Sequence, residues 1–380
     1  MGRVKGVRQA VVPSGRRRAR GSLSNPANRF DARVHESFDD GWEDEAEEDE
    51  AEEVEGVRID TVILPDHSRS ILVHNDSPDI PFSTSINPYR GCEHGCSYCF
   101  ARPSHAYLGL SAGLDFETRI LAKRDAPALL LEAWRKPSYR VQPIALGPNT
   151  DAYQPVERQL GITRALLALF AAHRHPVGLV TKSELVLRDR DLLSDLGRDG
   201  LAHVFVSLTT LDPTLARRME PRAASPRGRL RTIRRLAEAG VPVGVLVAPM
   251  IPGLNDHELE AIVAAAAEAG ATRAGTVLLR LPHDLKALFV EWLEASYPLR
   301  RDRVLGLLRD CRGGALSDAR FGDRMRGQGP YADLLQRRAT AAARRHGMTR
   351  EPFAFDLSRF RPPDPAPRDP RQLPLFGRAR

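Results

Sequence analysis

The sequence predicts an α/β fold built on a parallel sheet, and two observations carry that prediction. Between residues 82 and 295, short apolar segments alternate six times with longer segments of helical periodicity. Parallel strands need a crossover connection, and a helix is the usual crossover. The chain can also bury a substantial core, because 42% of its 380 residues are hydrophobic. We therefore expect six β-α units, in one large domain or two medium ones.

The six expected strands are short apolar runs, and each is followed by a helical pattern. The strands are expected at residues 82–89, 141–147, 177–181, 204–208, 241–248 and 274–281. The helices are expected at residues 126–135, 161–173, 188–196, 227–239, 257–269 and 285–295. Alternation of this kind predicts one sheet in which successive strands are parallel.

Charge divides the rest of the chain. Residues 39–55 contain twelve acidic side chains and no Lys or Arg, and without them the balance is 56 basic against 37 acidic residues, or +19. Nineteen arginines follow residue 298. An excess of positive charge fits a polyanionic partner such as nucleic acid, while an arginine-rich composition with ordinary solvated faces remains an alternative. The acidic run is typical of a disordered tether.

These patterns divide the chain into four expected parts. They are a disordered, basic then acidic region (1–56), the β-α region (57–298), a helical extension (299–361) and a Pro-rich tail (362–380). No apolar run approaches the length of a membrane span, and no apolar signal core follows the basic N-terminus. We expect a cytoplasmic protein with reduced thiols.

Three of the four cysteines, Cys92, Cys96 and Cys99, fall within eight residues. This density predicts a metal site, and three thiolates leave one metal position open. Two alternatives remain: a zinc site completed by His94 or His105, and a redox pair of Cys96 with Cys99 that leaves the third thiol unexplained.

Polar residues follow the second to sixth expected strands. Because the loops after parallel strands open onto one face, these residues are expected to share that face, although N-cap and turn roles are alternatives for each. The polar segments are 147–151, 181–183, 207–210, 248–252 and 280–283.

The spacing C-x3-C-x2-C, with Tyr98 before and Phe100 after the third cysteine, resembles the cluster loop of the radical S-adenosylmethionine (SAM) superfamily. The resemblance implies a partial (β/α)6 TIM-type barrel and a [4Fe-4S] cluster held by the three cysteines. The fourth iron would bind SAM, whose reductive cleavage gives a 5′-deoxyadenosyl radical. It also implies a flavodoxin- or ferredoxin-type electron donor.

Further residues resemble the SAM-binding pattern of the spore photoproduct lyase group. By that resemblance, Thr150 and Asp151 approach the amino group of SAM, Lys182 its carboxylate and Ser207 its ribose. The stretch from Glu220 to Arg222, together with Arg229, is similar to a segment that borders SAM, so Arg222 and Arg229 join the cofactor candidates, with helix-surface roles as their alternative.

The chain departs from that group at two positions. Asn149 stands where the photoproduct lyases have a hydrogen-donating cysteine, and Phe100 stands where they have a tyrosine of the radical relay. The repair reaction is therefore not carried over. Segments 20–30, 87–92, 100–105, 150–157 and 322–330 resemble an uncharacterised bacterial group labelled DNA repair photolyase-like.

Polar residues outside the SAM pattern are candidates for contact with the substrate. They are expected on the open face, although Tyr153 could belong to the core and His283 could be an N-cap; the candidates are His105, Tyr153, Gln154, Glu157, Arg280 and His283. Cys311 is either a hydrogen-atom donor or a buried structural thiol.

The tail contains Gln372-Leu373-Pro-Leu375-Phe376, which resembles peptides that bind the bacterial sliding clamp. Three functional hypotheses follow from the sequence. The first is a radical SAM enzyme acting on nucleic acid or an associated molecule, the second is the same chemistry on a peptide or small metabolite, and the third is a zinc-stabilised nucleic-acid-binding module without catalysis.

Overall fold

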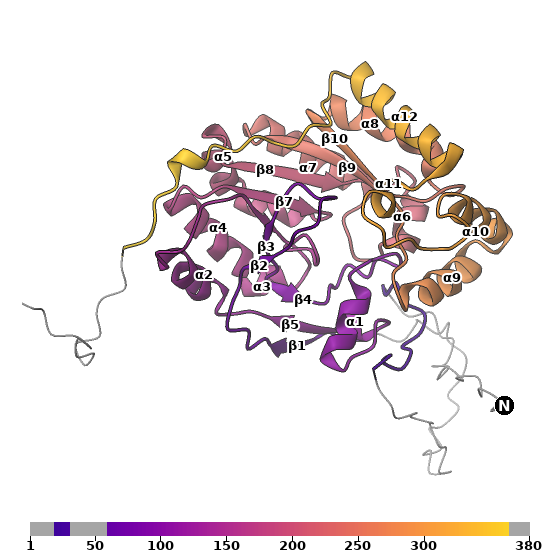
Figure 1. The fold of residues 1–380 in the computed structure, drawn as a ribbon, viewed down its shortest axis with the longest axis horizontal. Coiled ribbons are helices and arrows are strands. Elements are labelled where there is room, and N and C mark those ends of the chain that lie inside the picture. The colour runs from indigo at the N-terminus through magenta and orange to yellow at the C-terminus, as the bar shows by residue number, and fades with distance from the viewer. Residues whose placement is uncertain (1–18, 31–58, 365–380) are drawn as a thin grey trace, which may run out of the picture.

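The computed structural model describes residues 19–30 and 59–364, and it confirms the predicted mixed α/β fold around a parallel sheet (Figure 1). Six parallel strands lie side by side in the order in which the chain visits them, as successive β-α units require. They are β3 (Thr84–Ile86), β6 (Ile144–Leu146), β7 (Val177–Thr181), β8 (Ala202–Ser207), β9 (Val243–Met250) and β10 (Arg273–Leu278). A seventh strand, β2 (Val73–His74), pairs with β3 in the antiparallel direction.

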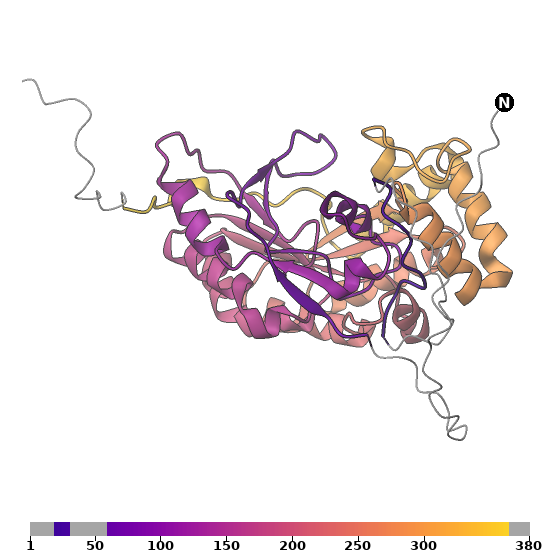
Figure 2. The same cartoon turned by 90° about the horizontal axis from the view of Figure 1, so that it is seen from below.

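Helices cover one side of this sheet (Figure 2), and the six expected helices are all present. They are α2 (Ala126–Arg135), α4 (Ile162–Ala172), α5 (Arg190–Arg198), α7 (Pro226–Glu238), α8 (Leu259–Glu268) and α9 (Leu285–Ser296). Helix α7 shows why they form: Ser225 caps its N-terminus by accepting from the Gly228 amide. Its buried residues Arg229, Ile233 and Leu236 recur at helical spacing, so one face packs inward.

The first expected strand is broken in two, because Pro88 has no N–H to donate to a ladder. Its first part is β3 in the main sheet. Its second part is β4 (Tyr89–Arg90), which belongs to a separate three-stranded sheet with β1 (Val62–Pro65) and β5 (Arg119–Ala122). The break moves the cysteine loop from the end of a main-sheet strand to the end of β4.

Three helices lie in the part of the chain expected to be a helical extension: α10 (Arg301–Asp310), α11 (Asp323–Arg326) and α12 (Gly329–Arg345). The structure also adds short elements that the sequence pattern did not predict, which are α1 (Asp115–Thr118), α3 (Glu157–Leu160), α6 (Pro213–Met219) and the 3₁₀ segments η1 (Arg102–Leu108), η2 (Glu184–Asp189), η3 (Asp256–Glu258), η4 (Pro298–Arg300) and η5 (Leu357–Arg359). Residues of α12 belong to the same hydrophobic core as the sheet. The C-terminal extension is therefore packed into the barrel.

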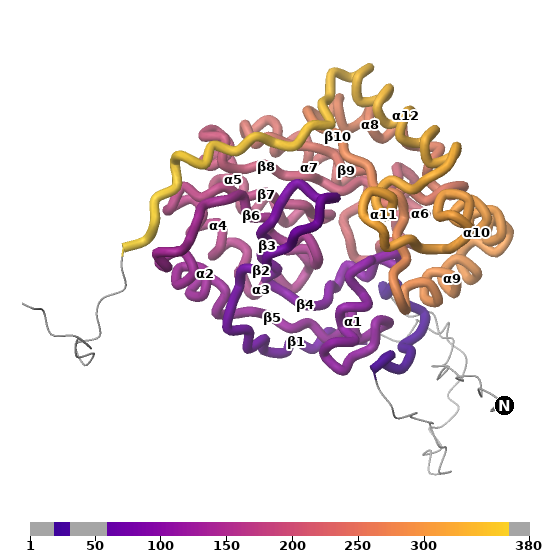
Figure 3. Tube along the Cα trace, in the orientation of Figure 1, coloured from indigo at the N-terminus to yellow at the C-terminus, as the bar shows by residue number. Residues whose placement is uncertain are grey.

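After α12 the chain covers the open edge of β10 and then runs across the molecule past α5 toward α2 (Figure 3). Thr349 pairs with Arg273 at the edge of β10. Farther along, the Arg361 amide donates to the His173 carbonyl over 2.8 Å, and Phe360 packs edge-on against His175. These contacts lie before β7, so this segment borders the end of the barrel opposite to the strand carboxyl ends.

Within residues 19–30 and 59–364, no helix is long and apolar enough to span a bilayer. The acidic run 39–55 and the clamp-like segment 372–376 lie outside the described residues, so both remain predictions.

Candidate functional site

The cysteine loop makes a tight path between β4 and η1. Gly91 and Gly95 have left-handed φ angles of 80° and 66°, which favour glycine. A Cβ on Gly91 would lie 2.9 Å from the Phe116 carbonyl oxygen, so the backbone at Phe116 also excludes a side chain there. Cys92 and Cys96 are each 7% exposed and Cys99 is half-buried, and none of them forms a disulfide. The loop therefore presents three thiols that are largely withdrawn from water.

The three thiols are close enough to influence one another. Burial, Asp151 and the other two cysteines hold the pKa of Cys92 well above its usual range. Burial raises the pKa of Cys96 to about 12, with Glu220 and Cys99 adding to the shift and Lys182 opposing it. Burial disfavours the thiolate form of all three cysteines, and a positively charged group between them, such as the iron of a cluster, would offset this effect.

The alternatives to a cluster find little support in this arrangement. His94 Nδ1 pairs with Asp151 Oδ2 at 3.3 Å and His105 Nε2 bonds to the Arg119 carbonyl at 3.0 Å, so one nitrogen of each imidazole is engaged elsewhere, while His105 Nδ1 is buried without a hydrogen-bond partner. In the described part of the chain, no three His, Cys, Asp or Glu side chains are grouped to hold a single metal ion. Cluster ligands bind separate irons, so they need not converge on one point.

Asp151 is the central acid of the face that the carboxyl ends of the main-sheet strands form beside the cysteine loop. Its Oδ1 accepts from the Thr181 hydroxyl at 2.8 Å, and its Oδ2 accepts from the Lys182 amide at 2.8 Å. Burial alone would raise the pKa of Asp151, but His94 and the backbone donors of Lys182 and Tyr153 lower it to about 2. The carboxylate is therefore held ionised and in a fixed orientation where β6 and β7 end.

Lys182 is the cation of this face. Its Nζ lies 5.9 Å from the centre of the Tyr98 ring. Burial would lower its pKa, but Cys96 and Glu220 more than offset that effect, so the pKa of Lys182 is raised. The side chain is held protonated between the cysteine loop and the ends of the strands.

The hydroxyl groups of the other SAM candidates, Thr150 and Ser207, both donate to backbone carbonyls. The Thr150 hydroxyl donates to the Tyr89 carbonyl at 2.7 Å and keeps its lone pairs as acceptors. Ser207, at the end of β8, is 1% exposed and donates to the Ala248 carbonyl at 3.2 Å. Both residues remain at the strand ends where the sequence placed them.

Arg222 and Arg229 are occupied by protein partners. Arg229 is 2% exposed and reaches the Ser207 carbonyl at 3.0 Å and the carboxylate of Glu220. Arg222 pairs with Glu93 Oε1 at 3.1 Å. The alternative that Arg229 lies on a helix surface is wrong, because its guanidinium is buried behind Ser207.

Glu220 organises this buried layer, a role that the sequence did not reveal. Its carboxylate accepts from the Tyr98 hydroxyl, from Arg229 and, over 2.7 Å, from the Thr209 hydroxyl. Tyr98 lies between two cluster cysteines, so this acid links the cysteine loop to the end of β8. Its only sequence signal was its place beside Arg222.

Four of the substrate candidates are buried and do not lie on an open face, which for Tyr153 is the core alternative given above. His105, Tyr153, Gln154 and Glu157 are each 0% exposed. Gln154 supports the cysteine loop instead: its Oε1 accepts from the Glu93 amide at 2.9 Å and its Nε2 donates to the Gly91 carbonyl at 3.1 Å. In the sequence, buried polar residues that bond to backbone groups cannot be distinguished from polar residues on an open surface.

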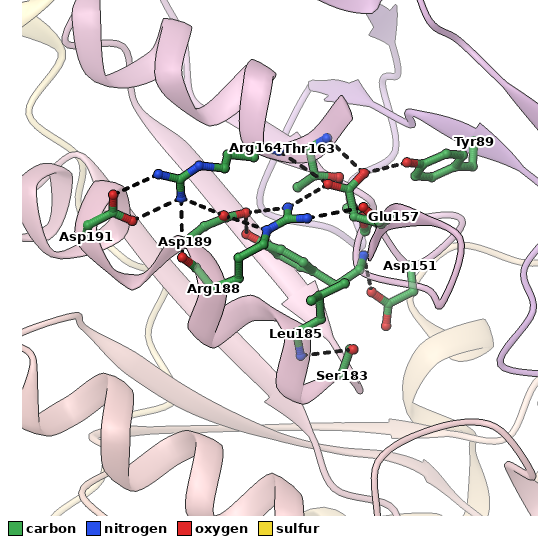
Figure 4. A network of polar contacts seen from close by, with 12 residues as sticks. Tyr89, Asp151, Glu157, Thr163, Arg164, Ser183, Leu185, Arg188, Asp189 and Asp191 are labelled. Atoms are coloured by element: carbon green, nitrogen blue, oxygen red, sulfur yellow. Dashed lines mark hydrogen bonds and ion pairs between the residues drawn. The ribbon is translucent and has the colours of Figure 1, made fainter. Parts of the chain in front are cut away.

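Glu157 lies in a buried network beneath the face (Figure 4). It accepts from the Tyr89 hydroxyl, from the Thr163 amide at 3.0 Å and from Arg188 Nη2 at 2.6 Å. Tyr153 donates to Asp189 in the same network at 3.1 Å. Tyr89 immediately precedes the cysteine loop along β4, so this network supports the loop from below.

The remaining candidates lie at the border of the face. Arg280 is half-buried beyond the end of β10, and His283 is exposed with a positive φ of 47°. Cys311 is 0% exposed and belongs to the main core cluster. That burial favours the structural interpretation of Cys311.

The N-terminal arm, residues 19–30, packs directly on the cysteine loop. The amides of Gly21 and Ser22 donate to the two oxygens of buried Glu117 over 2.9 and 2.8 Å. Glu117 in turn pairs with buried Arg102, whose Nε donates to the Cys96 carbonyl at 2.9 Å. The arm then reaches α9, where Ser24 donates to Glu291 (Figure 1).

Comparison with known proteins agrees with this geometry. Residues 86–266 match the family model of the radical SAM superfamily. The chain is 37% identical to an uncharacterized protein of Mycobacterium tuberculosis over 232 residues, covering 60% of this chain and 68% of the relative. It is 28% identical to an uncharacterized protein of Methanocaldococcus jannaschii over 173 residues, covering 46% of this chain and 62% of that one.

The fold is also similar to solved structures. A spore photoproduct lyase mutant with bound AdoMet and dinucleoside spore photoproduct superposes with a TM-score of 0.54 at 18% identity, covering 77% of this chain and 82% of that one. At this identity the likeness concerns the fold. The family match, the mycobacterial relative and the cysteine loop together show that the chain belongs to the radical SAM superfamily, whose members use a [4Fe-4S] cluster and SAM.

Proposed function

We propose that this chain is a radical SAM enzyme in which Cys92, Cys96 and Cys99 hold the cluster. The observation that carries the proposal is the set of three closely spaced thiols, two buried and one half-buried, on a loop fixed by two left-handed glycines. When both cofactors are bound, they supply reductive cleavage of SAM to methionine and a 5′-deoxyadenosyl radical, which takes a hydrogen atom from the substrate.

In this proposal each side chain of the face binds the part of SAM that its chemistry suits. Asp151 is held ionised and accepts from the ammonium group, together with the free lone pairs of Thr150. Lys182 is held protonated and binds the carboxylate of SAM. Ser207 is assigned to the ribose hydroxyls. Charge complementarity at both ends of the methionyl group fixes its orientation.

Arg222 and Arg229 are assigned as positioning residues. Arg229 holds the Ser207 carbonyl and Glu220, and through Glu220 it holds Tyr98 within the cysteine loop. Arg222 holds Glu93, whose amide also bonds Gln154. Each therefore acts on cofactor binding through a neighbour.

The proposed substrate is a nucleic acid or a nucleic-acid-associated molecule, and a peptide or small metabolite is the second candidate. The basic balance of the chain outside its acidic run favours the first candidate. A flavodoxin- or ferredoxin-type protein is proposed as the electron donor. The segment from Gln372 to Phe376, including Leu373 and Leu375, is proposed to bind the sliding clamp, which a binding assay with a peptide of residues 367–380 tests.

The enzyme proposal is tested with the full chain, reconstituted anaerobically and reduced with dithionite. We expect 5′-deoxyadenosine to form from SAM. Lys182→Met should weaken SAM binding roughly 10-fold or more, because a charge-assisted hydrogen bond contributes about 1.5–3 kcal/mol. Lys286→Met, on the exposed surface of α9, is the matched control and should bind SAM as the wild type does. A chain that holds iron but forms no 5′-deoxyadenosine contradicts the proposal.

A further inference from the structure

The segment 321–326 of the C-terminal extension lies beside Arg280, the residue that follows Leu279 at the open end of the barrel. Arg312, which is 2% exposed, holds the two parts together. Its Nη1 donates to the Asp323 carbonyl at 2.7 Å, and its Nη2 donates to the Leu279 carbonyl at 2.7 Å. The position of α11, labelled in Figure 1, relative to Arg280 is therefore fixed by a buried hydrogen-bonded link.

Arg280 is a half-buried cation that forms no ion pair within 4 Å in the described part of the chain. Its Nη1 contacts the Met325 sulfur at 3.6 Å. The acid that acts on Arg280 from farther away is Asp79, and Asp79 is already paired with Arg324, next to Met325. Partly buried charges are ordinarily paired, so Arg280 lacks an anion that a ligand can provide.

One exposed aromatic ring lies beside this cation, and a second lies beside the neighbouring cation Arg324. Phe100 directly follows Cys99, is 45% exposed and lies with its ring centre 5.6 Å from the Arg280 guanidinium carbon. Phe321 is 58% exposed, and Arg324 lies 4.5 Å from its ring centre. Exposed rings beside guanidinium groups offer planar, apolar surfaces within a positive field.

We propose that Phe100, Arg280 and Phe321 form a subsite for a nucleotide within a single-stranded nucleic acid. Arg280 binds a backbone phosphate, and the two rings stack on bases. This inference rests on the proposed function and names its substrate class. The position of Phe100 beside a cluster cysteine places the stacked base next to the reacting centre.

The combination of features favours a nucleotide over an acidic peptide. A carboxylate would satisfy Arg280, but it would leave the solvent-exposed parts of both rings uncovered. A base pair within a duplex hides both of its faces in the stack, so ring stacking requires an unpaired or extruded base. The excess of arginine over acidic residues outside residues 39–55 adds long-range attraction for a polyanion.

The test measures binding of the anaerobically reconstituted full chain to a fluorescein-labelled single-stranded oligonucleotide by fluorescence anisotropy, from about 50 to 200 mM salt. The same titrations use a duplex of equal length and a poly-glutamate peptide. Two variants remove one feature each. Arg280→Gln should weaken binding and lower the salt slope by about one. Phe100→Leu should weaken binding about 5- to 150-fold and leave the slope unchanged.

Arg234→Gln is the matched control, because Arg234 is an exposed arginine on α7, and it should bind the oligonucleotide as the wild type does. Thermal melting verifies that the variants fold, and SAM binding is measured in parallel. If the wild-type chain binds SAM but not the oligonucleotide, the subsite alone is overturned. If the wild-type chain does not bind SAM, the proposed function is overturned. Equal affinity for the duplex, preference for poly-glutamate, or wild-type binding by both Arg280→Gln and Phe100→Leu also overturns the subsite.

Discussion

Replacing Gly21 by alanine tests whether the N-terminal arm positions the cysteine loop. A Cβ on Gly21 would lie 1.6 Å from the Gly95 carbonyl oxygen and 2.7 Å from its carbonyl carbon. Ordinary contact begins at 3.4 Å, so the arm or the loop must move by nearly 2 Å. Both neighbours are backbone atoms, which cannot rotate away as the end of a side chain can. The substitution therefore forces apart two segments that the fold holds together.

The size of the effect follows from what the arm would release. The amides of Gly21 and Ser22 bond to Glu117, whose oxygens are otherwise buried with Arg102. Hydrogen bonds to a charged group contribute about 1.5–3 kcal/mol each, so loss of one or both predicts a decrease of about 1.5–6 kcal/mol in the free energy of unfolding. If the loop moves instead, the displacement passes to Gly95 and the cysteines that flank it.

Chemical denaturation and iron content after anaerobic reconstitution measure these two outcomes. Gly306→Ala is the matched control, because no atom lies within 4 Å of a Cβ at this position in α10. Alanine should stabilise that helix by up to about 1 kcal/mol. Wild-type stability together with wild-type iron content in Gly21→Ala would refute the positioning role of the arm.

Three further predictions concern buried groups. Glu157→Ala should lower the free energy of unfolding by about 3–5 kcal/mol and leave the SAM affinity of the folded fraction unchanged. Its control is Glu184→Ala, which removes an exposed ion pair and should lower the free energy of unfolding by under about 1 kcal/mol. Denaturation curves in which Glu184→Ala is the less stable variant would contradict the role of the network. Burial lowers the pKa of His175 to about 3, so its unfolded form binds the extra proton below about pH 6.5. Its contribution is full above that pH and falls by about 1.4 kcal/mol per unit toward pH 3, a slope that His175→Phe should remove from denaturation midpoints. Cys311→Ala should leave product formation intact, and loss of product while 5′-deoxyadenosine still forms would restore the hydrogen-donor role of Cys311.

The sequence predicted the parts of the fold that depend on local periodicity. The six β-α units were readable because apolar residues repeat within each segment, as Ile233 and Leu236 do in α7. The break at Pro88 was visible as a residue type, but its consequence depends on β5, which joins the chain about thirty residues later. Such pairing is nonlocal, and a single sequence carries no signal for it.

In the candidate site too, local patterns were predicted from the sequence, and contacts between distant residues were not. Cysteine spacing and polar strand ends pointed to the cluster loop, Asp151 and Lys182. Glu117 and Glu157 were not recognised as buried acids, because their partners are distant in sequence: the Gly21 amide that bonds Glu117 is separated from it by 96 positions. Polar residues are usually exposed, and only the folded arrangement shows which of them are satisfied inside.

The central claim is that Cys92, Cys96 and Cys99 hold a cluster with one iron open to SAM. The most direct measurement is the electron paramagnetic resonance spectrum of the reconstituted, dithionite-reduced chain before and after addition of SAM. The account predicts a reduced [4Fe-4S] signal whose g values change when SAM binds, and replacement of any of the three cysteines by alanine should abolish it. A spectrum without a cluster signal, or one that SAM leaves unchanged, would contradict it.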